Sequence, residues 1–159
     1  HVLDDDYYRR IEAIQFTMSH DDGKKVDDIN TADVILLGVS RTSKTPTSIY
    51  LANRGFKTIN IPLVLDQKIP DSLKLNKKAC IIGLIADPER LADIRRNRVA
   101  IMKDHNIKEY TDLNFIKKEV NDSRDLFKKN NWPIIDVTRR SVEETAASIL
   151  KIIEIKKKR

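Results

Sequence analysis

The stretch that decides the fold runs from Asp33 to Gly55 and reads DVILLGVSRTSKTPTSIYLANRG. A short apolar run leads into a polar loop that opens at Gly38 and closes on Lys44-Thr45, and a helical pattern continues until Gly55. Strand, loop and helix in this order are the context of a phosphate-binding loop, because backbone N–H groups at the start of the helix converge on an anion. The stretch therefore predicts an α/β fold with a phosphate site at its centre.

The loop is close to the Walker A pattern, a glycine followed by four free positions and Gly-Lys-Ser/Thr, but it does not match fully. Gly38, the spacing and the Lys44-Thr45 pair are present, whereas Ser43 occupies the position of the second glycine. We expect the Ser43 side chain to exclude the backbone angles that glycine adopts there, which would give the loop a somewhat different shape. The alternative interpretation is a polar connection whose basic residues are incidental.

The side chains of this loop suit a nucleotide. Lys44 would neutralise phosphate charge, the Thr45 hydroxyl could ligate Mg²⁺, and Arg41 offers a planar, bidentate grip on phosphate. The predicted nucleotide-binding residues are Gly38, Val39, Ser40, Arg41, Thr42, Ser43, Lys44 and Thr45.

Composition indicates one globular domain of 159 residues, 34% of them charged, with a net charge of +6 that suits an anionic ligand. We interpret the basic tail, residues 156–159, as a solvated end and predict no nucleic-acid partner. A single cysteine, Cys80, excludes an internal disulfide and favours a reducing cytoplasm, with the thiol as a small core residue. We predict no signal peptide and no membrane span. The chain begins at His1 without methionine, so we expect a fragment of a longer protein.

The region before the loop predicts a helix and an acidic turn. A helix is expected over Asp4 to Ser19, with an apolar face of Tyr7, Ile11, Ile14 and Met18 packed against the sheet. The turn that follows reads His20-Asp21-Asp22-Gly23. Two carboxylates beside a histidine suit metal binding or acceptance of a hydroxyl proton, although an acidic surface turn explains the same residues.

Alternating strand and helix patterns follow the loop. They predict strands at Lys57–Leu63, Lys78–Ala86 and Trp132–Val137, and helices at Asp87–Lys103, Thr111–Lys129 and Val142–Ile155. Pro62 should end the pairing of its strand, Asp87 should cap one helix, and Ser141 with Glu144 should form a capping box. The predicted architecture is a parallel sheet of about four strands flanked by helices, P-loop-like, with 1–32 as helix and acidic turn and 33–159 as α/β core.

Two further groups of residues are candidates for binding phosphate. Arg95 and Arg98 are three apart on one helix and could grip one phosphate together, although a basic solvated face is an equal explanation. The second group follows the last strand at the sheet edge where ligands bind, and consists of Thr138, Arg139, Arg140 and Ser141. His105 is interpreted as a surface residue.

Five separated motifs, in register over essentially the whole chain, resemble the regulatory protein of pyruvate, phosphate dikinase, a family shared with the regulator of phosphoenolpyruvate synthetase. They are Arg10–Ile14, His20–Gly23, Gly38–Pro46, Gly83-Leu84 with Pro88–Leu91 and Arg95-x-x-Arg98, and Asp136–Thr138 with Ser141–Ala147.

The resemblance implies a bifunctional enzyme. Such proteins use ADP to phosphorylate and inactivate a threonine of the dikinase, and they remove the group with inorganic phosphate, releasing pyrophosphate. Thr42-Ser43 and Trp132–Thr138 resemble the dikinase branch more than the synthetase branch. Phosphoenolpyruvate synthetase as the target, an ADP-sensing module without catalysis, and an ATP-dependent small-molecule kinase remain alternatives. Family members are longer at the N-terminus, so a further N-terminal region is expected to be absent here.

Carried onto this sequence, the resemblance assigns roles to the candidate residues. The Gly38–Thr45 loop would hold the ADP phosphates, with Lys44 neutralising charge and Thr45 near any Mg²⁺. Asp22 or Asp21, beside His20, would be the base for the threonine hydroxyl. Arg41, Arg95 or Arg98 would position the attacking phosphate. The expected partner is pyruvate, phosphate dikinase in the cytoplasm, and a homodimer is an open expectation.

Overall fold

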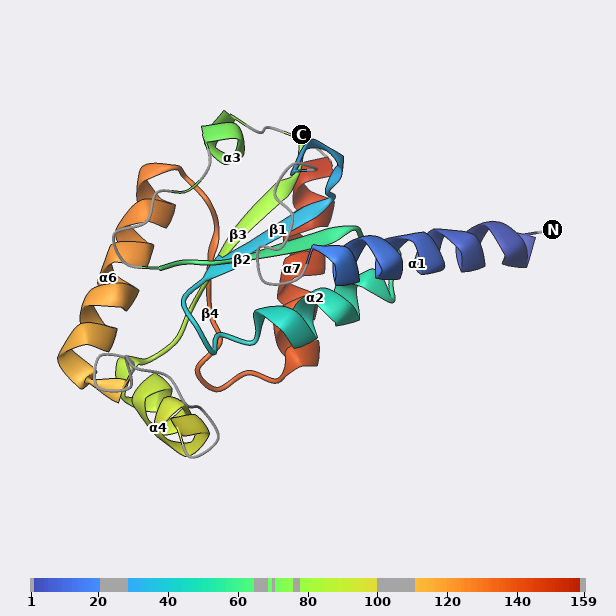
Figure 1. The fold of residues 1–159 in the computed structure, drawn as a ribbon. Coiled ribbons are helices and arrows are strands. Elements are labelled where there is room, and N and C mark those ends of the chain that lie inside the picture. The colour runs from blue at the N-terminus through green and yellow to red at the C-terminus, as the bar shows by residue number, and fades with distance from the viewer. Residues whose placement is uncertain are drawn as a thin grey trace.

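The computed structural model has a four-stranded parallel sheet between two groups of helices (Figure 1). It describes residues 2–20, 29–64, 69, 71–75, 78–99 and 111–157. Within them the strands are β1 (Val34–Gly38), β2 (Thr58–Pro62), β3 (Cys80–Ile85) and β4 (Ile134–Asp136), in the order β2-β1-β3-β4. The α/β class and the strand number predicted from the sequence are confirmed for the described residues.

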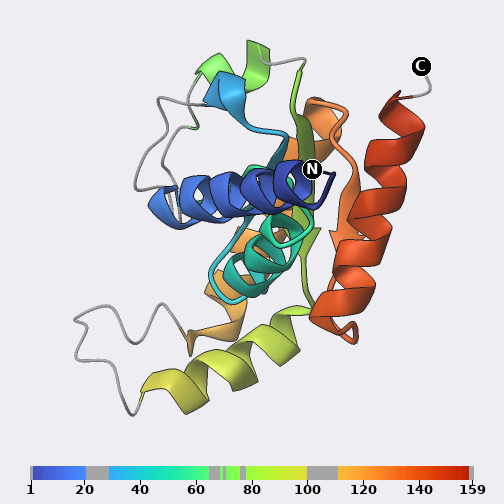
Figure 2. The same cartoon turned by 90° about the vertical axis from the view of Figure 1, so that its right-hand side faces the viewer.

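Helices cover both faces of this sheet. One face carries α1 (Val2–Ser19), α2 (Lys44–Ala52) and α7 (Val142–Lys157), and the opposite face carries α6 (Leu113–Lys129), with α4 (Pro88–Val99) packed beside it (Figures 1 and 2). Two short helices, η2 (Ile29–Thr31) and α3 (Asp71–Leu75), complete the described elements. The two covered faces explain why β1 and β3 are apolar throughout.

The strand order creates a switch point between β1 and β3. The chain leaves β1 toward β2 on one side and returns to β3 on the other, which puts the loops after β1 and β3 side by side at the carboxyl ends of the strands. This is the order in which flavodoxin-like doubly wound sheets begin, and ligands of such sheets bind at the switch point. The predicted loop follows β1, so the fold places it where a ligand is expected.

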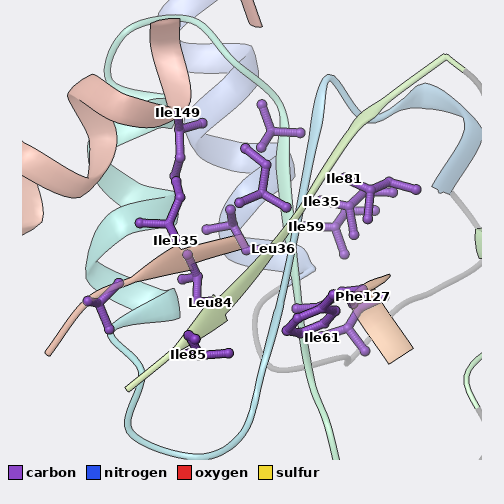
Figure 3. Close-up of a cluster of buried hydrophobic side chains, with 14 of the residues drawn as sticks. Ile35, Leu36, Ile59, Ile61, Ile81, Leu84, Ile85, Phe127, Ile135 and Ile149 are labelled. Atoms are coloured by element: carbon purple, nitrogen blue, oxygen red, sulfur yellow. The ribbon is translucent and has the colours of Figure 1, made fainter. Parts of the chain in front are cut away.

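The core consists of aliphatic side chains that alternate between the two faces of the sheet. Ile35 lies beside Ile59 and Ile81 through the strand register, on the face that Phe127 of α6 covers, whereas Leu36 points toward the face of α7 and Ile149 (Figure 3). All of these side chains except Ile81 are fully buried or nearly so, and Ile81 is 5% exposed. Burying apolar area of this kind stabilises a fold by about 25 cal/mol per Å².

The predicted element boundaries are close to the observed ones. The β2 pairing ends at Pro62, whose neighbour Leu63 donates its N–H to the Gly38 carbonyl at 2.9 Å. Asp87 caps α4 through Arg90 N at 3.2 Å, and the Ser141–Glu144 capping box forms at the start of α7. The expected helix over Thr111–Lys129 begins instead at Leu113, because Asp112 accepts a hydrogen bond from Asn114 N and serves as its N-cap.

The predicted packing face of α1 is wrong. Tyr7 and Met18 are 61% and 64% exposed, whereas Ala13 and Thr17 are buried. Small side chains at positions 13 and 17 let α1 approach α2 and the start of β2 closely, and Thr17 Oγ1 accepts a hydrogen bond from Thr58 N at 3.1 Å. The hydrophobic periodicity identified the helix but not the face that is buried.

Cys80 is buried at the start of β3, as predicted for a core thiol. Burial raises the pKa of the Cys80 thiol and outweighs the opposite effect of Lys156, so the thiolate is disfavoured. The predictions for Asp21, Asp22 and His105 lie outside the described residues.

Candidate functional site

The connection between β1 and α2 has the backbone geometry of an anion-binding loop. The φ angle is 71° at Arg41 and 62° at Ser43, and it is negative at Thr42 and Lys44, so its sign alternates along the loop. Backbone conformations that alternate in this way point successive N–H groups into one concavity, which binds anions. These angles favour the interpretation as an anion-binding loop, without the second glycine of the Walker pattern.

The expectation that Ser43 avoids glycine-like angles is wrong. Ser43 has φ 62° and ψ 27°, in the left-handed helical region. That region costs an L-residue about 1–2 kcal/mol but is not closed to it, unlike the conformations that only glycine reaches. The Ser43 side chain makes no capping hydrogen bond to α2, and the first turn of α2 contains no acidic residue. The positive end of the helix dipole thus meets no protein carboxylate in that turn.

Gly38 is required for space and not for its φ angle. A Cβ atom built at Gly38 would lie 2.6 Å from Thr42 Oγ1 and 3.0 Å from the Leu84 carbonyl oxygen. Thr42 is fully buried, and its hydroxyl donates to the Val39 carbonyl at 2.8 Å. The loop therefore folds directly over the Cα of Gly38, and Val39 and Thr42 serve its shape more than its ligand.

A pocket of about 330 Å³ lies at this edge of the sheet. The β1–α2 loop provides most of its lining, and the end of β2 and one residue of α4 complete it. The lining residues are Ser40, Arg41, Ser43, Lys44, Thr45, Pro46, Pro62 and Ile94. Among these described lining residues, two side chains are cationic and none is a carboxylate, which favours an anion. Five of the eight predicted nucleotide-binding residues line it.

Lys44 is the most constrained cation of the pocket. Its side chain is only 5% exposed, and Nζ donates to the Val39 carbonyl at 2.9 Å and to Thr42 Oγ1 at 3.4 Å. These acceptors hold the ammonium group inside the curve of the loop. A phosphate that enters the pocket would compete with the Val39 carbonyl for this group, and its negative charge makes it the stronger acceptor.

The residues of the pocket fit a magnesium ion in one respect. Mg²⁺ is usually bound by one or two protein oxygens together with substrate phosphates and water, and the Thr45 hydroxyl on the pocket wall could be such a ligand. The described residues contain no group of three or more His, Cys, Asp or Glu side chains that could hold a metal on their own. A magnesium ion held by the described residues would therefore need further ligands, such as the phosphates of a nucleotide.

Arg95 does not lie on the surface of α4 as expected. Its side chain is 1% exposed and forms an ion pair with Glu119 of α6, with Nη1 2.8 Å from Oε1. Nη2 also donates to the Ser40 carbonyl at 3.2 Å. Arg95 thus contacts the loop from the protein interior and is not a surface grip on phosphate. The backbone of Arg98 belongs to α4, but its side chain lies outside the described residues, so its role in phosphate binding stays a prediction.

The residues after β4 stabilise the fold at this edge. The Thr138 hydroxyl interacts with Asp136 Oδ1 and accepts a hydrogen bond from Asp87 N at 2.8 Å, which links the loops after β3 and β4. Arg140 donates to Ser148 Oγ at 3.0 Å, and Ser141 caps α7. Arg139 is exposed. None of the four predicted residues lines the pocket.

His20 is not among the described residues that line the pocket. It follows α1, and its backbone N–H donates to the carbonyl of Thr17 in that helix. His20 is 3% exposed and stacks on Phe16, and its Nδ1 lies 2.6 Å from the Phe16 carbonyl oxygen. The described structure does not bring His20 together with Lys44. Asp21 and Asp22 lie outside it.

Sequence reasoning missed Glu119. It is buried against Arg95, with which it forms an ion pair. The available signal was its position: Glu119 lies three residues after the buried Ile116 and next to the buried Val120, on the inward face of α6.

Comparisons with known proteins give a consistent result. The family model described as kinase/pyrophosphorylase matches residues 1–150. A protein of Pelagibacter ubique is 63% identical over 158 residues, which cover 99% of this chain and 58% of the relative. Proteins of Sinorhizobium fredii and a Chelativorans species are 55% and 52% identical over 96% of this chain and 56% of each relative. All three carry the name "Putative pyruvate, phosphate dikinase regulatory protein".

The chain spans less than three-fifths of the length of these relatives. Among the described residues, no helix is both long enough and apolar enough to cross a membrane.

Proposed function

The chain belongs to the kinase/pyrophosphorylase family, and from this premise we propose that it carries the phosphate-binding part of a bifunctional regulator of pyruvate, phosphate dikinase. In one direction the hydroxyl oxygen of a dikinase threonine attacks the β-phosphorus of ADP, AMP leaves, and a base takes the hydroxyl proton. In the other direction an oxygen of inorganic phosphate attacks the phosphothreonine, pyrophosphate forms, and the threonine oxygen regains a proton. We place this reaction in the cytoplasm.

The observation that carries the proposal is the loop of alternating φ sign around Lys44, at the mouth of a cationic pocket. Both directions of the reaction require a site for a diphosphate, either as the phosphates of ADP or as product pyrophosphate. Convergent N–H groups, Arg41 and Lys44 suit such an anion in a fixed position, and fixed donors stabilise charge that develops during transfer. One loop can therefore serve both directions.

The donor nucleotide tests the proposal. The 159-residue chain is incubated with purified dikinase and with ADP or ATP, and phosphothreonine is detected by mass spectrometry; the full-length Pelagibacter ubique relative is assayed in parallel. We expect transfer from ADP. Transfer from ATP alone would identify a P-loop kinase of the ordinary type, and nucleotide binding without transfer by either protein would identify a sensing module. Purified phosphoenolpyruvate synthetase as a second acceptor tests the other target.

The base for the threonine hydroxyl is proposed to be Asp22 or Asp21. Replacing the responsible aspartate with asparagine removes the proton acceptor, so phosphorylation should fall by about 10²–10⁴-fold. We expect the loss in only one of Asp21→Asn and Asp22→Asn, measured as the initial rate of phosphothreonine formation. Asp122→Asn, at an exposed position of α6, is the control. Equal and mild losses in both variants would make the turn an ordinary acidic surface turn.

A further inference from the structure

The buried pair of Arg95 and Glu119 has no explanation in stability alone. Both side chains are removed from water, with exposed fractions of 1% and 9%. Removing two charges from water costs about as much as their attraction returns, and apolar side chains of the same size are often equally stable. The pair is therefore expected to do something that two apolar side chains could not.

What the charged pair provides is a hydrogen bond from Arg95 to the backbone of the β1–α2 loop. Glu119 holds the guanidinium by two oxygens, Oε1 2.8 Å from Nη1 and Oε2 3.4 Å from Nη2. This leaves Nη2 able to donate to the Ser40 carbonyl at 3.2 Å. Glu119 fixes the plane of the guanidinium, and the guanidinium fixes a carbonyl of the loop.

The position of this carbonyl determines where the next N–H points. The described chain has no cis peptide bond, and in a trans peptide the C=O of one residue and the N–H of the next point in opposite directions. Because Arg95 holds the Ser40 carbonyl from the interior, the Arg41 N–H points away from the ion pair. The φ of 71° at Arg41 then begins the alternation that makes the N–H groups converge.

The preceding carbonyl is held in a similar way. Val39 O accepts hydrogen bonds from Thr42 Oγ1 and Lys44 Nζ. The carbonyls of residues 39 and 40, which would repel a phosphate if they faced it, are thus both bound by protein donors. When a phosphate binds, Lys44 is expected to give up its hydrogen bond to the Val39 carbonyl. Arg95 is buried and is expected to keep its hydrogen bond to the Ser40 carbonyl.

We propose that Glu119 and Arg95 are positioning residues that hold the Ser40–Arg41 peptide in the anion-binding orientation. The pair acts from behind the loop and touches no ligand. This inference rests on the proposed function, since it concerns the same site. The backbone order of the loop can nevertheless be measured without any ligand.

The test is a double variant that removes the pair and keeps its volume, Arg95→Met with Glu119→Leu. The matched control is Arg96→Met with Asp93→Leu, which removes an exposed ion pair of α4 whose side chains are 59% and 68% exposed. Each protein is measured for melting temperature, for backbone NMR order parameters over residues 40–44, and for the Kd of inorganic pyrophosphate.

We expect the double variant to melt within about 5 °C of the parent chain, since apolar replacement of a buried pair is nearly neutral. Its order parameters at Arg41 and Ser43 should fall from about 0.85 to below about 0.6, and its pyrophosphate affinity should fall about tenfold or more. The control should change neither. A folded double variant with an ordered loop and unchanged affinity would overturn the proposal.

Two results would require a further measurement or a further variant. If the parent chain does not bind pyrophosphate, the proposed function fails, and the order parameters of the loop alone decide the role of the pair. If the double variant does not fold, Arg95→Lys replaces it. A lysine keeps the charge opposite Glu119 but cannot supply the planar fork, so loop order should fall while the melting temperature changes little. Unchanged loop order in that variant would overturn the proposal.

Discussion

Replacing Lys44 with alanine should lower both transfer from ADP and phosphate-dependent removal of the phosphoryl group, each by about 10²–10³-fold. The ammonium group is held inside the loop, 2.9 Å from the Val39 carbonyl oxygen, where an incoming phosphate can replace that oxygen as its hydrogen-bond acceptor. In the proposed function both directions place a diphosphate in this pocket, so both directions would lose the positive charge of Lys44. The measurement is the rate of phosphothreonine gain with ADP and of its loss with inorganic phosphate.

The Lys44 experiment needs a test of folding as well as a control. The side chain is buried and donates two hydrogen bonds, so the melting temperature of the variant must be compared with that of the parent. Thr42 still donates to Val39 O in the variant, which should preserve the loop. Lys117→Ala, exposed on α6, removes a lysine elsewhere and should leave both rates unchanged. Survival of either rate in a folded Lys44→Ala protein would show that the two activities do not share the loop.

Replacing Gly83 with alanine should lower the free energy of unfolding by about 3 kcal/mol or more. Gly83 lies in β3, between Leu37 of β1 and Ile134 of β4 in the strand register. A Cβ atom there would lie 2.3 to 2.4 Å from three ring carbons of Phe127, which is fully buried. Neither the strand nor the ring can move without disturbing the core. Urea denaturation of the variant gives the free energy.

A double-mutant cycle checks that the clash with Phe127 is the cause. Phe127→Leu alone should destabilise the chain by leaving a cavity, but in the Gly83→Ala background it should cost less or restore stability, since it removes the ring that the new methyl group meets. Additive effects of the two substitutions would mean that Gly83 is needed for another reason, such as the backbone of β3 itself.

Local sequence patterns predicted the elements well because their causes are local. Continuous apolar runs identified β1 and β3, and the Ser141–Glu144 box identified the start of α7, since each of these signals acts within a few residues. The loop around Lys44 was also located by a local pattern. The backbone angles of Ser43 were predicted incorrectly because the cost of a left-handed serine is small enough for the surrounding structure to impose it.

Side-chain positions were predicted less well because they depend on neighbours that are distant in the sequence. The stripe of Tyr7 and Met18 has the correct period for a helix, yet Ala13 and Thr17 are buried because the start of β2 and α2 fit closely against small residues. Arginine is a residue type that often binds phosphate, but the partner of Arg95 is Glu119, which is 24 residues away in the sequence and on another helix.

By itself the sequence determined the α/β class, the order of the elements, the family resemblance and the position of the candidate phosphate-binding loop, because these follow from periodicity, capping and short motifs. Only the tertiary structure decided which face of α1 is buried, that His20 is buried against Phe16, and that Arg95 donates to the Ser40 carbonyl from the protein interior. The physical reason is that burial and pairing of charges are set by contacts between segments, which the strand order β2-β1-β3-β4 brings together.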